Sequence, residues 1–149
     1  MIRPFQPDDA QACSEIIRAC VLEDPGLSPQ LKEKLLGLET PAAMLERAQL
    51  YYVAVHESDG VLTGLAGLDL NEIRVLFVSP ANRHGGIGRA LVEHLGSMVP
   101  QALFKDIFVY SMPGAAGFYR ALGFRDRGPA VFDIRGTPME TVFMTRPAL

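Results

Sequence analysis

Apolar residues recur every three or four positions at the start of the chain. A stripe begins after Asp8 and Asp9, which are residues suited to cap a helix. It consists of Cys13, Ile16, Ile17, Cys20 and Val21, and its spacing predicts an amphipathic helix. Two further helices are expected, the first opened by Ser28-Pro29 and carrying Leu31, Leu35, Leu36 and Leu38, the second opened by Pro41 and carrying Met44, Leu45 and Ala48.

The pattern then changes to short β-rich runs. Residues 51–55 and 61–68 flank a turn at 57–60 and predict a hairpin, and residues 73–78 predict a central strand. Alternation in this strand places Glu72 and Arg74 on the face of Leu76 and Val78. The following elements are a helix at 86–98, a strand at 103–109, a short helix at 114–122, and strands at 130–134 and 139–145. The order βααββαβαββ predicts an α+β fold, with a six- to seven-stranded mixed sheet that contains one central parallel pair.

Length and charge narrow the function classes. A chain of 149 residues, 48% of them hydrophobic, suits one domain over residues 1–149. Fourteen basic and 17 acidic residues give a net charge of −3, and no Lys or Arg cluster could follow a phosphate backbone, so no nucleic-acid partner is expected. Because no apolar run reaches the length of a membrane span, no membrane partner is expected and a soluble, cytoplasmic protein is predicted.

The cysteines and histidines predict neither a disulfide nor a metal site. Cys13 and Cys20 lie seven positions apart on one predicted helix, which is too far for a disulfide. Both lie on the apolar stripe and are predicted to pack in the core. His56, His84 and His94 lack the close spacing and the neighbouring carboxylates of a zinc site.

A strand, a polar turn, three glycines and a helix follow one another in residues 78–91. The first turn of a helix carries unpaired N–H groups and the positive end of the helix dipole, and glycines let an anion approach the backbone. The segment predicts a pyrophosphate site, with charge added by Arg83 and Arg89; a tight strand-to-helix connection is the alternative. A P-loop would need a Gly-Lys-Ser/Thr ending, and a Rossmann loop would need glycine or alanine at Leu91.

The same segment resembles the coenzyme A loop of the GCN5-related N-acetyltransferase (GNAT) superfamily. That loop reads Arg/Gln-x-x-Gly-x-Gly/Ala after a strand ending Val-x-Pro, and the matching residues here are Val78, Pro80, Arg83, Gly86 and Gly88. A second GNAT motif, Ala-x-x-Phe-Tyr-x-x-x-Gly-Phe, is matched by Ala115, Phe118, Tyr119, Gly123 and Phe124. The chain departs from the family pattern at Gly85, which is usually Arg or Lys, and at Met112, which is commonly Asn.

The resemblance implies a GNAT-like fold with splayed central parallel strands, and acetyl-coenzyme A as the co-substrate. Residues 72–126 would form the coenzyme-binding core. The implied contacts are Leu76, Phe77 and Val78 on the strand, Arg83, His84, Gly85, Gly86, Gly88 and Arg89 in the loop, and Ser111 in place of the missing Asn. In this likeness the Leu76 N–H polarises the acetyl carbonyl, and no metal takes part.

The resemblance also implies direct transfer of the acetyl group to a primary amine of a small molecule or peptide. Glu72 would act as the base, with a strand-end ion pair as the alternative interpretation and Asp69 or water as a substitute base. Tyr119 would act as the general acid for the departing thiolate, with a core aromatic beside Phe118 as the alternative.

The helices within residues 22–48 would contact the acceptor, and Leu27, Tyr51 and Tyr52 are candidate lining residues. The sequence does not identify the acceptor. A catalytically inactive coenzyme A-binding regulatory module and a non-enzymatic interaction domain stay open as alternatives, as does a homodimer.

Overall fold

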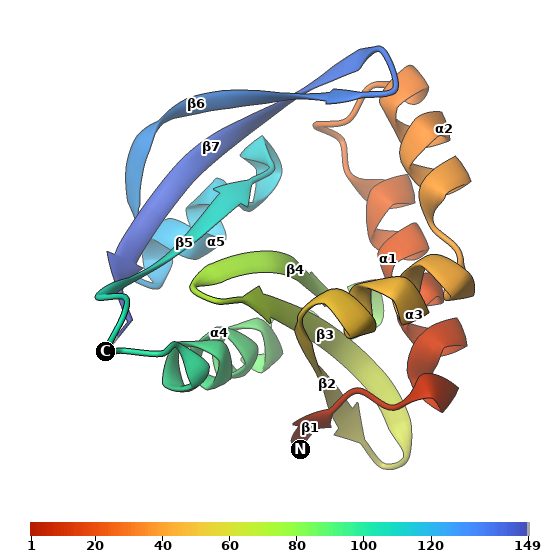
Figure 1. The fold of residues 1–149 in the computed structure, drawn as a ribbon. Helices are drawn as coiled ribbons and strands as arrows, with labels where there is room; N and C mark the ends of the chain where they lie inside the picture. The colour runs from red at the N-terminus through yellow and green to blue at the C-terminus, as the bar shows by residue number, and fades with distance from the viewer. Residues whose placement is uncertain (149) are drawn as a thin grey trace.

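The computed structural model describes residues 1–148 as one twisted sheet with helices on both faces (Figure 1). The strands in this range are β1 (Ile2–Pro4), β2 (Tyr52–Ser58), β3 (Val61–Asp69), β4 (Glu72–Val78), β5 (Asp106–Ser111), β6 (Arg125–Ile134) and β7 (Thr137–Pro147). The helices are α1 (Ala10–Glu23), α2 (Pro29–Leu38), α3 (Pro41–Leu50), α4 (Ile87–Met98) and α5 (Ala116–Ala121), with 3-10 turns η1 (Pro7–Asp9), η2 (Pro80–Asn82) and η3 (Pro113–Ala115). The strand order is β1-β2-β3-β4-β5-β7-β6. The predicted α+β class with a mixed sheet is confirmed.

Polar side chains fix where the second and third helices begin. Ser28 accepts a hydrogen bond from the backbone N–H of Leu31, and Thr40 accepts one from that of Ala43, each at 3.1 Å. A proline follows each cap, and its fixed φ suits the first helical position. Both helices therefore start where the sequence predicted.

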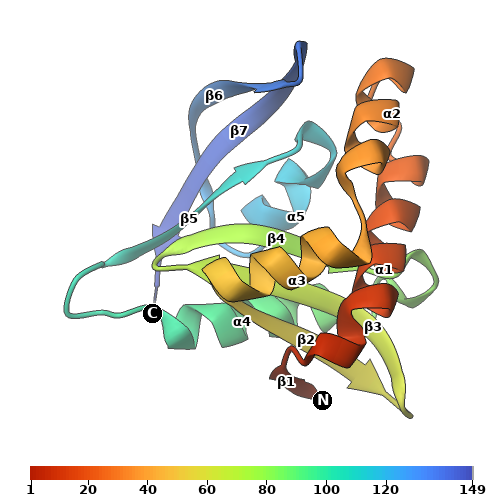
Figure 2. The same cartoon turned by 45° about the vertical axis from the view of Figure 1, so that its right-hand side comes forward.

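Each face of the sheet carries its own hydrophobic core. One core lies between the sheet and the helices α4 and α5, and contains Leu91 and Met144. The other lies beneath α1, α2 and α3, and contains Met44 and Leu65. Figure 2 shows α3 and α4 on opposite sides of the sheet. Cys13 is fully buried in the second core, which confirms its predicted packing role.

A β-bulge changes which side chains of β4 share a face. Consecutive pairs of the β3–β4 ladder skip Arg74, which is the extra residue, and an extra residue shifts the alternation by one position. Ile73 therefore packs in the same core as Leu76, and Glu72 points to the opposite face. The prediction that Glu72 shares a face with Leu76 is wrong, because a strict period of two cannot reveal a bulge.

The parallel strands β4 and β5 pair only at one end. Glu72 lies opposite Phe108 and Ile73 opposite Val109, and these are the only β4–β5 pairs in residues 1–148. Strand β5 continues instead along β7, so β4 and β5 diverge from Val75 onward. The central parallel pair, predicted from the order of elements, and its splay, expected from the GNAT resemblance, are confirmed.

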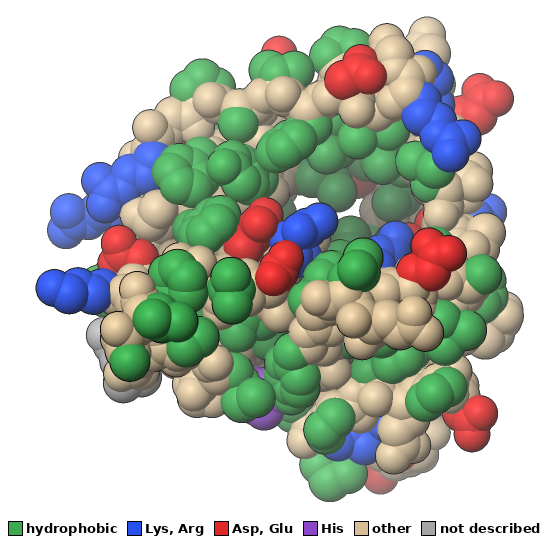
Figure 3. All heavy atoms as spheres, viewed as in Figure 1, with side chains coloured by type: hydrophobic (Ala, Val, Ile, Leu, Met, Phe, Trp, Pro, Cys, Tyr) green, Lys and Arg blue, Asp and Glu red, His purple; other side chains and the backbone are tan. Residues whose placement is uncertain are grey.

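The hairpin of β6 and β7 arches from the end of the sheet to α2 (Figure 1). At its turn the carbonyl of Arg135 accepts a hydrogen bond from Lys34 Nζ at 2.6 Å. Ile134 and Met139 pack against the core beneath α1 and α2. The contact between the hairpin tip and α2 thus closes a ring of elements. Figure 3 shows that an opening remains inside this ring when all side chains are drawn.

Two strands begin at clearly different residues from those predicted. Strand β5 begins at Asp106 and not at Leu103, because the Leu103 N–H bonds to the Pro100 carbonyl at 2.9 Å in a turn that leaves the leucine exposed. Strand β6 begins at Arg125 and not at residue 130. It is an edge strand with a register shift after Asp126, so its first residues are polar and lack clear alternation.

None of the helices in residues 1–148 is long and apolar enough to cross a membrane. In the same part of the chain, no three His, Cys, Asp or Glu side chains gather in a way that could hold a metal ion. The absence of a metal from the reaction stays a prediction from the sequence.

Candidate functional site

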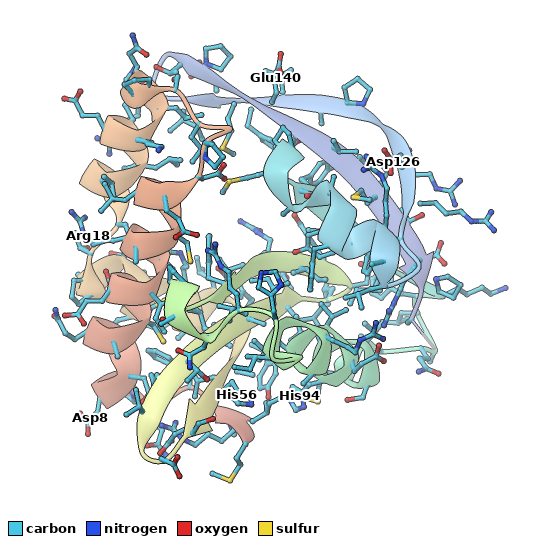
Figure 4. All side chains as sticks on the ribbon, turned by 180° about the vertical axis from the view of Figure 1, so that it is seen from behind. Asp8, Arg18, His56, His94, Asp126 and Glu140 are labelled. Carbon is cyan, nitrogen blue, oxygen red and sulfur yellow. The ribbon has the colours of Figure 1, made fainter. Side chains whose placement is uncertain are left out.

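A pocket of about 710 Å³ opens where β4 and β5 diverge. Its walls are the free edge of β4, the end of α1, the turn before α4, the end of β5 and the residues of α5. Figure 4, seen from behind, shows α1 and α5 on opposite sides of this region. A volume of this size is typical of small-molecule and cofactor sites.

The start of α4 presents unpaired backbone donors to the pocket. The first helical hydrogen bond runs from the Ala90 N–H to the Gly86 carbonyl at 3.0 Å. The N–H groups of Ile87, Gly88 and Arg89 therefore have no backbone acceptor among the described residues, and all three residues line the pocket. Together with the helix dipole, these donors suit an anion such as a pyrophosphate.

The glycines of this turn are needed for different reasons. Gly86 has a φ of 83°, and a Cβ built there would meet no described atom within 4 Å, so glycine keeps the space beside the helix start open. A Cβ on Gly88 would lie 3.0 Å from the Phe118 ring, so a larger residue there would have to push this ring aside. His84, with a φ of 67°, lines the pocket, whereas Gly85 does not.

Arg83 is held by the end of α1. Its guanidinium forms an ion pair with Glu23 and donates to the Sγ of Cys20 at 3.4 Å. The side chains of Arg83 and Glu23 are 40% and 43% exposed to solvent, and ion pairs this exposed contribute little to stability. A bound phosphate could therefore compete with Glu23 for Arg83, and Arg89 lies exposed at the same pocket.

The free edge of β4 faces the pocket. The N–H of Ser79 bonds to the Thr63 carbonyl on β3 at 2.8 Å, and backbone groups alternate between the two edges of a strand. Phe77 therefore directs its N–H and C=O toward β3, while Leu76 and Val78 direct theirs into the gap. The backbone contact predicted for Phe77 is not available at this edge.

Tyr119 combines a buried ring with a hydroxyl at the pocket. The residue is 4% exposed, and its ring packs edge-on against the rings of Phe118 and Phe124, with ring centroids 5.1 and 5.2 Å apart. It lines the pocket, and burial alone raises the pKa of Tyr119 well above its usual value. The hydroxyl thus stays protonated and has no hydrogen-bond partner among the described residues, which leaves it free to donate to a ligand.

Ser111 ends β5 with a buried side chain that also lines the pocket. Its hydroxyl donates a hydrogen bond to the Met112 carbonyl at 2.7 Å. The proton of Ser111 is therefore engaged within the protein, and its oxygen can serve a ligand only as an acceptor.

Glu72 lies at the start of β4, next to the pocket-lining residues but not among them. Its carboxylate is 4.0 Å from Nε of Arg74, which pairs more closely with Asp69 at 3.2 Å. Desolvation raises the pKa of Glu72, and the Arg74 charge opposes this. A raised pKa suits a group that must accept a proton, and the weak contact with Arg74 gives little support to a structural ion pair.

The residues predicted to line an acceptor fall on different faces. Leu27 and Tyr51 belong to the core beneath α1 to α3, where the Arg74 guanidinium lies 5.5 Å from the Tyr51 ring centre. Tyr52 packs on the other face and shares a 2.7 Å hydrogen bond with Nε2 of His94 on α4. The prediction for Tyr52 is wrong, because it begins β2 while Tyr51 still caps α3.

Four residues at the pocket were not predicted as functional. Cys20 donates its thiol to the Val78 carbonyl at 3.2 Å, and Glu23 holds the arginine of the loop. Tyr110 and Phe118 both line the pocket, and each is 37% exposed. These residues come from α1, β5 and α5, so no local motif unites them. The one signal in the sequence was Tyr110, which alternates with the buried residues of its strand.

Comparison with known proteins identifies the family. Residues 24–143 match the model of the acetyltransferase (GNAT) domain. The chain belongs to the GNAT family. The predicted superfamily is confirmed, and the matched domain is an acetyltransferase domain.

Curated GNAT relatives carry several names. Peptidyl-lysine N-acetyltransferase YjaB of Escherichia coli strain K12 is 37% identical over 87 residues, which cover 58% of this chain and 57% of YjaB. An amino-acid acetyltransferase of Pseudomonas putida is 30% identical, covering 76% of this chain and 28% of its own length. IAA acetyltransferase of Azospirillum brasilense is 30% identical, with 81% and 80% coverage. The chain thus spans about half or less of the first two relatives.

Solved GNAT structures share the fold over nearly the whole chain. A GCN5-related N-acetyltransferase from Rhodopseudomonas palustris has a TM-score of 0.91 at 21% identity, covering 99% of this chain and 94% of its own. A phosphinothricin acetyltransferase from Sinorhizobium meliloti, in complex with AcCoA, has a TM-score of 0.74 at 25% identity, with 99% and 87% coverage. Structural neighbours of this chain therefore bind acetyl-coenzyme A.

Proposed function

We propose that this chain transfers the acetyl group of acetyl-coenzyme A directly to a primary amine of a small-molecule or peptide acceptor. The observation that carries the proposal is the pocket between the splayed strands, with the unpaired N–H groups of α4 at one end. The AcCoA complex of the Sinorhizobium meliloti relative supports the co-substrate. The names of the peptidyl-lysine and amino-acid relatives support an amine acceptor.

In this proposal residues 72–126 bind the co-substrate, which supplies an activated thioester. The N–H groups at the start of α4 bind the pyrophosphate, and Arg83 and Arg89 add positive charge. The backbone groups of Leu76 and the N–H of Val78, which face the gap, bind the amides of the pantetheine arm. The Leu76 N–H stabilises negative charge as it develops on the acetyl oxygen.

The acceptor amine must lose a proton to attack. An amine with a pKa near 10.4 costs about 4 kcal/mol to deprotonate near pH 7.5, so a base lowers the barrier. Glu72 takes this proton, directly or through water, as the nitrogen bonds to the acetyl carbon. The carbon–sulfur bond breaks, and Tyr119 donates a hydrogen bond to the departing sulfur. The helices within residues 22–48 contact the acceptor.

A thiol-release assay with acetyl-coenzyme A and a panel of primary amines tests the proposal. Release that depends on the amine supports acetyl transfer. Binding of acetyl-coenzyme A without release would favour the catalytically inactive regulatory module, and no binding at all would favour an interaction domain. The cytoplasmic location and the homodimer stay predictions.

A further inference from the structure

The C-terminal half of the sheet carries four aromatic rings that belong to neither core. They are Phe108 and Tyr110 on β5, Phe132 on β6 and Phe143 on β7, and we refer to them as the aromatic wall. The rings form a connected series, with centroid distances of 5.7 Å for Phe108–Phe143 and 5.1 Å for both Tyr110–Phe143 and Tyr110–Phe132. Helix α5 lies on the other face of these strands (Figure 1).

The aromatic wall is open and continues into the pocket. Tyr110 and Phe132 are 37% and 40% exposed. Tyr110 also lines the pocket together with Arg74, so one ring belongs to both surfaces. Burying apolar area of this kind against a ligand is favourable, and two partly exposed rings offer a ready contact surface for a further ring.

The candidate base lies beside the aromatic wall. Phe108 is the direct neighbour of Glu72 in the parallel β4–β5 ladder, and side chains of paired residues lie on the same face of a sheet. The Glu72 carboxylate and the Phe108 ring therefore share one face, whereas Tyr119 belongs to the core on the other face. An acceptor on the wall would approach the gap from the Glu72 side.

Charges around the wall favour a cation. The carboxylates of Asp69 and Glu72 both lie near the single guanidinium of Arg74. Two negative charges against one positive charge leave this rim negative, and the faces of aromatic rings also attract cations. Figure 3 shows acidic and basic side chains at the lower rim of the opening and apolar side chains over β5 to β7 beside it.

The arch limits the size of what can reach the wall. The hairpin tip is tied to α2 by the bond from Lys34 to the Arg135 carbonyl and by the packing of Ile134 and Met139. The wall is thus reached through an opening enclosed by α2, β4 and the hairpin. Such an opening admits a small molecule more readily than the surface of a folded protein.

We propose that the acceptor is a small primary amine that carries an aromatic ring. The ring packs on the aromatic wall, and the amine points toward Glu72. This inference rests on the proposed acetyl transfer and names the class of its acceptor. The alternative occupant, a second copy of this chain, is separated by the test below.

The experiment compares 2-phenylethylamine with propylamine in the thiol-release assay, using the wild type, Phe132→Ala and Val131→Ala. Val131 neighbours Phe132 on β6 and is 63% exposed, but it is not part of the wall, so it is the matched control. We expect kcat/KM for 2-phenylethylamine to exceed that for propylamine by about tenfold or more. Phe132→Ala should lower kcat/KM for 2-phenylethylamine by about five- to tenfold, mainly through KM, and should leave kcat/KM for propylamine unchanged. Val131→Ala should leave kcat/KM for both amines unchanged.

Several results would overturn the inference. Equal kcat/KM for the two amines, or an equal loss for both in Phe132→Ala, removes the aromatic acceptor and leaves acetyl transfer intact. If the wild type sediments as a dimer and Phe132→Ala as a monomer, with unchanged kinetics for both amines, the wall is an interface with a second copy of the chain. No thiol release with any amine, despite acetyl-coenzyme A binding, removes the proposed function as well. If Phe132→Ala does not fold, Phe132→Leu makes the same comparison, because it keeps apolar volume and removes the ring.

Discussion

At the scale of single residues, Tyr119 belongs to a core and to a candidate active site at once. Its ring is packed between aromatic neighbours, while its hydroxyl is unpaired at the pocket. Tyr119→Phe keeps the ring and removes only the hydroxyl. We expect kcat to fall by about one to two decades with an unchanged KM for acetyl-coenzyme A, because the lost interaction strengthens only as charge develops on sulfur. Steady-state kinetics measures both values.

Tyr52 provides the matched control for that substitution. Its hydroxyl is paired with His94 on α4, and neither residue lines the pocket, so Tyr52→Phe removes a hydrogen bond away from the pocket. This variant should melt at a lower temperature and keep its kcat. If Tyr119→Phe behaves in the same way, with normal turnover and a lower melting temperature, Tyr119 is a structural aromatic and its catalytic role fails.

Glu72 gives a prediction that depends on pH. Desolvation raises its pKa, so the carboxylate is available as a base only above that raised pKa, and kcat should fall on the acid side. Glu72→Gln should remove this acid limb and lower kcat most at pH values just above the raised pKa, with partial recovery at high pH as more amine is neutral without help. If Glu72→Gln keeps wild-type rates and an unchanged pH profile, the base is Asp69 or water. Asp69→Asn is the matched control, and its kcat should still fall on the acid side as in the wild type.

The same pKa shift predicts how Glu72→Gln affects stability. Because the folded-state pKa is raised, the contribution of Glu72 to stability is present at low pH and is lost as the pH rises through that pKa. The glutamine variant should therefore be no less stable than the wild type near neutral pH. A clear drop in its melting temperature would favour the structural ion-pair interpretation.

At the scale of elements, the end of α1 and the turn before α4 are joined through Glu23 and Arg83. This ion pair occupies a cation that the proposal assigns to a phosphate. Glu23→Gln should free Arg83 and strengthen acetyl-coenzyme A binding by about two- to fivefold, a small factor because exposed ion pairs are weak. Calorimetric titration measures the change. Unchanged or weaker binding would show that Arg83 does not contact the phosphates.

Elements encoded by consecutive residues could be predicted from the sequence, and those set by distant contacts could not. The start of α4 follows from its own glycines and apolar spacing, so its position and its open N–H groups were predictable. The bulge at Arg74 depends on the register with β3, and it decides the face of Glu72. The contact of Lys34 with the Arg135 carbonyl joins residues 101 positions apart. Such pairings leave no local pattern.

At the scale of the whole molecule, the splay of β4 and β5 organises everything around the pocket. Two ladder pairs hold the strands at one end, β5 then continues along β7, and the hairpin of β6 and β7 docks on α2. The coenzyme motifs were recognisable because they are short and continuous. The aromatic wall was not, because its four rings come from three strands and meet only in the folded chain.

The account depends most on acetyl-coenzyme A binding at the start of α4, and Gly86→Asp tests this directly. It places a carboxylate and a Cβ where the pyrophosphate would lie. Gly60→Asp is the matched control, since Gly60 has a φ of 78° against 83° for Gly86 and equally open surroundings, but it lies in the β2–β3 turn. Both variants should therefore carry similar backbone strain without ligand.

The deciding measurement is the shift in melting temperature on adding acetyl-coenzyme A at a hundredfold excess over its Kd. The wild type and Gly60→Asp should both be stabilised, by about 2.7 kcal/mol. Gly86→Asp should show no shift. A full shift in Gly86→Asp would contradict the assignment of the pocket to acetyl-coenzyme A.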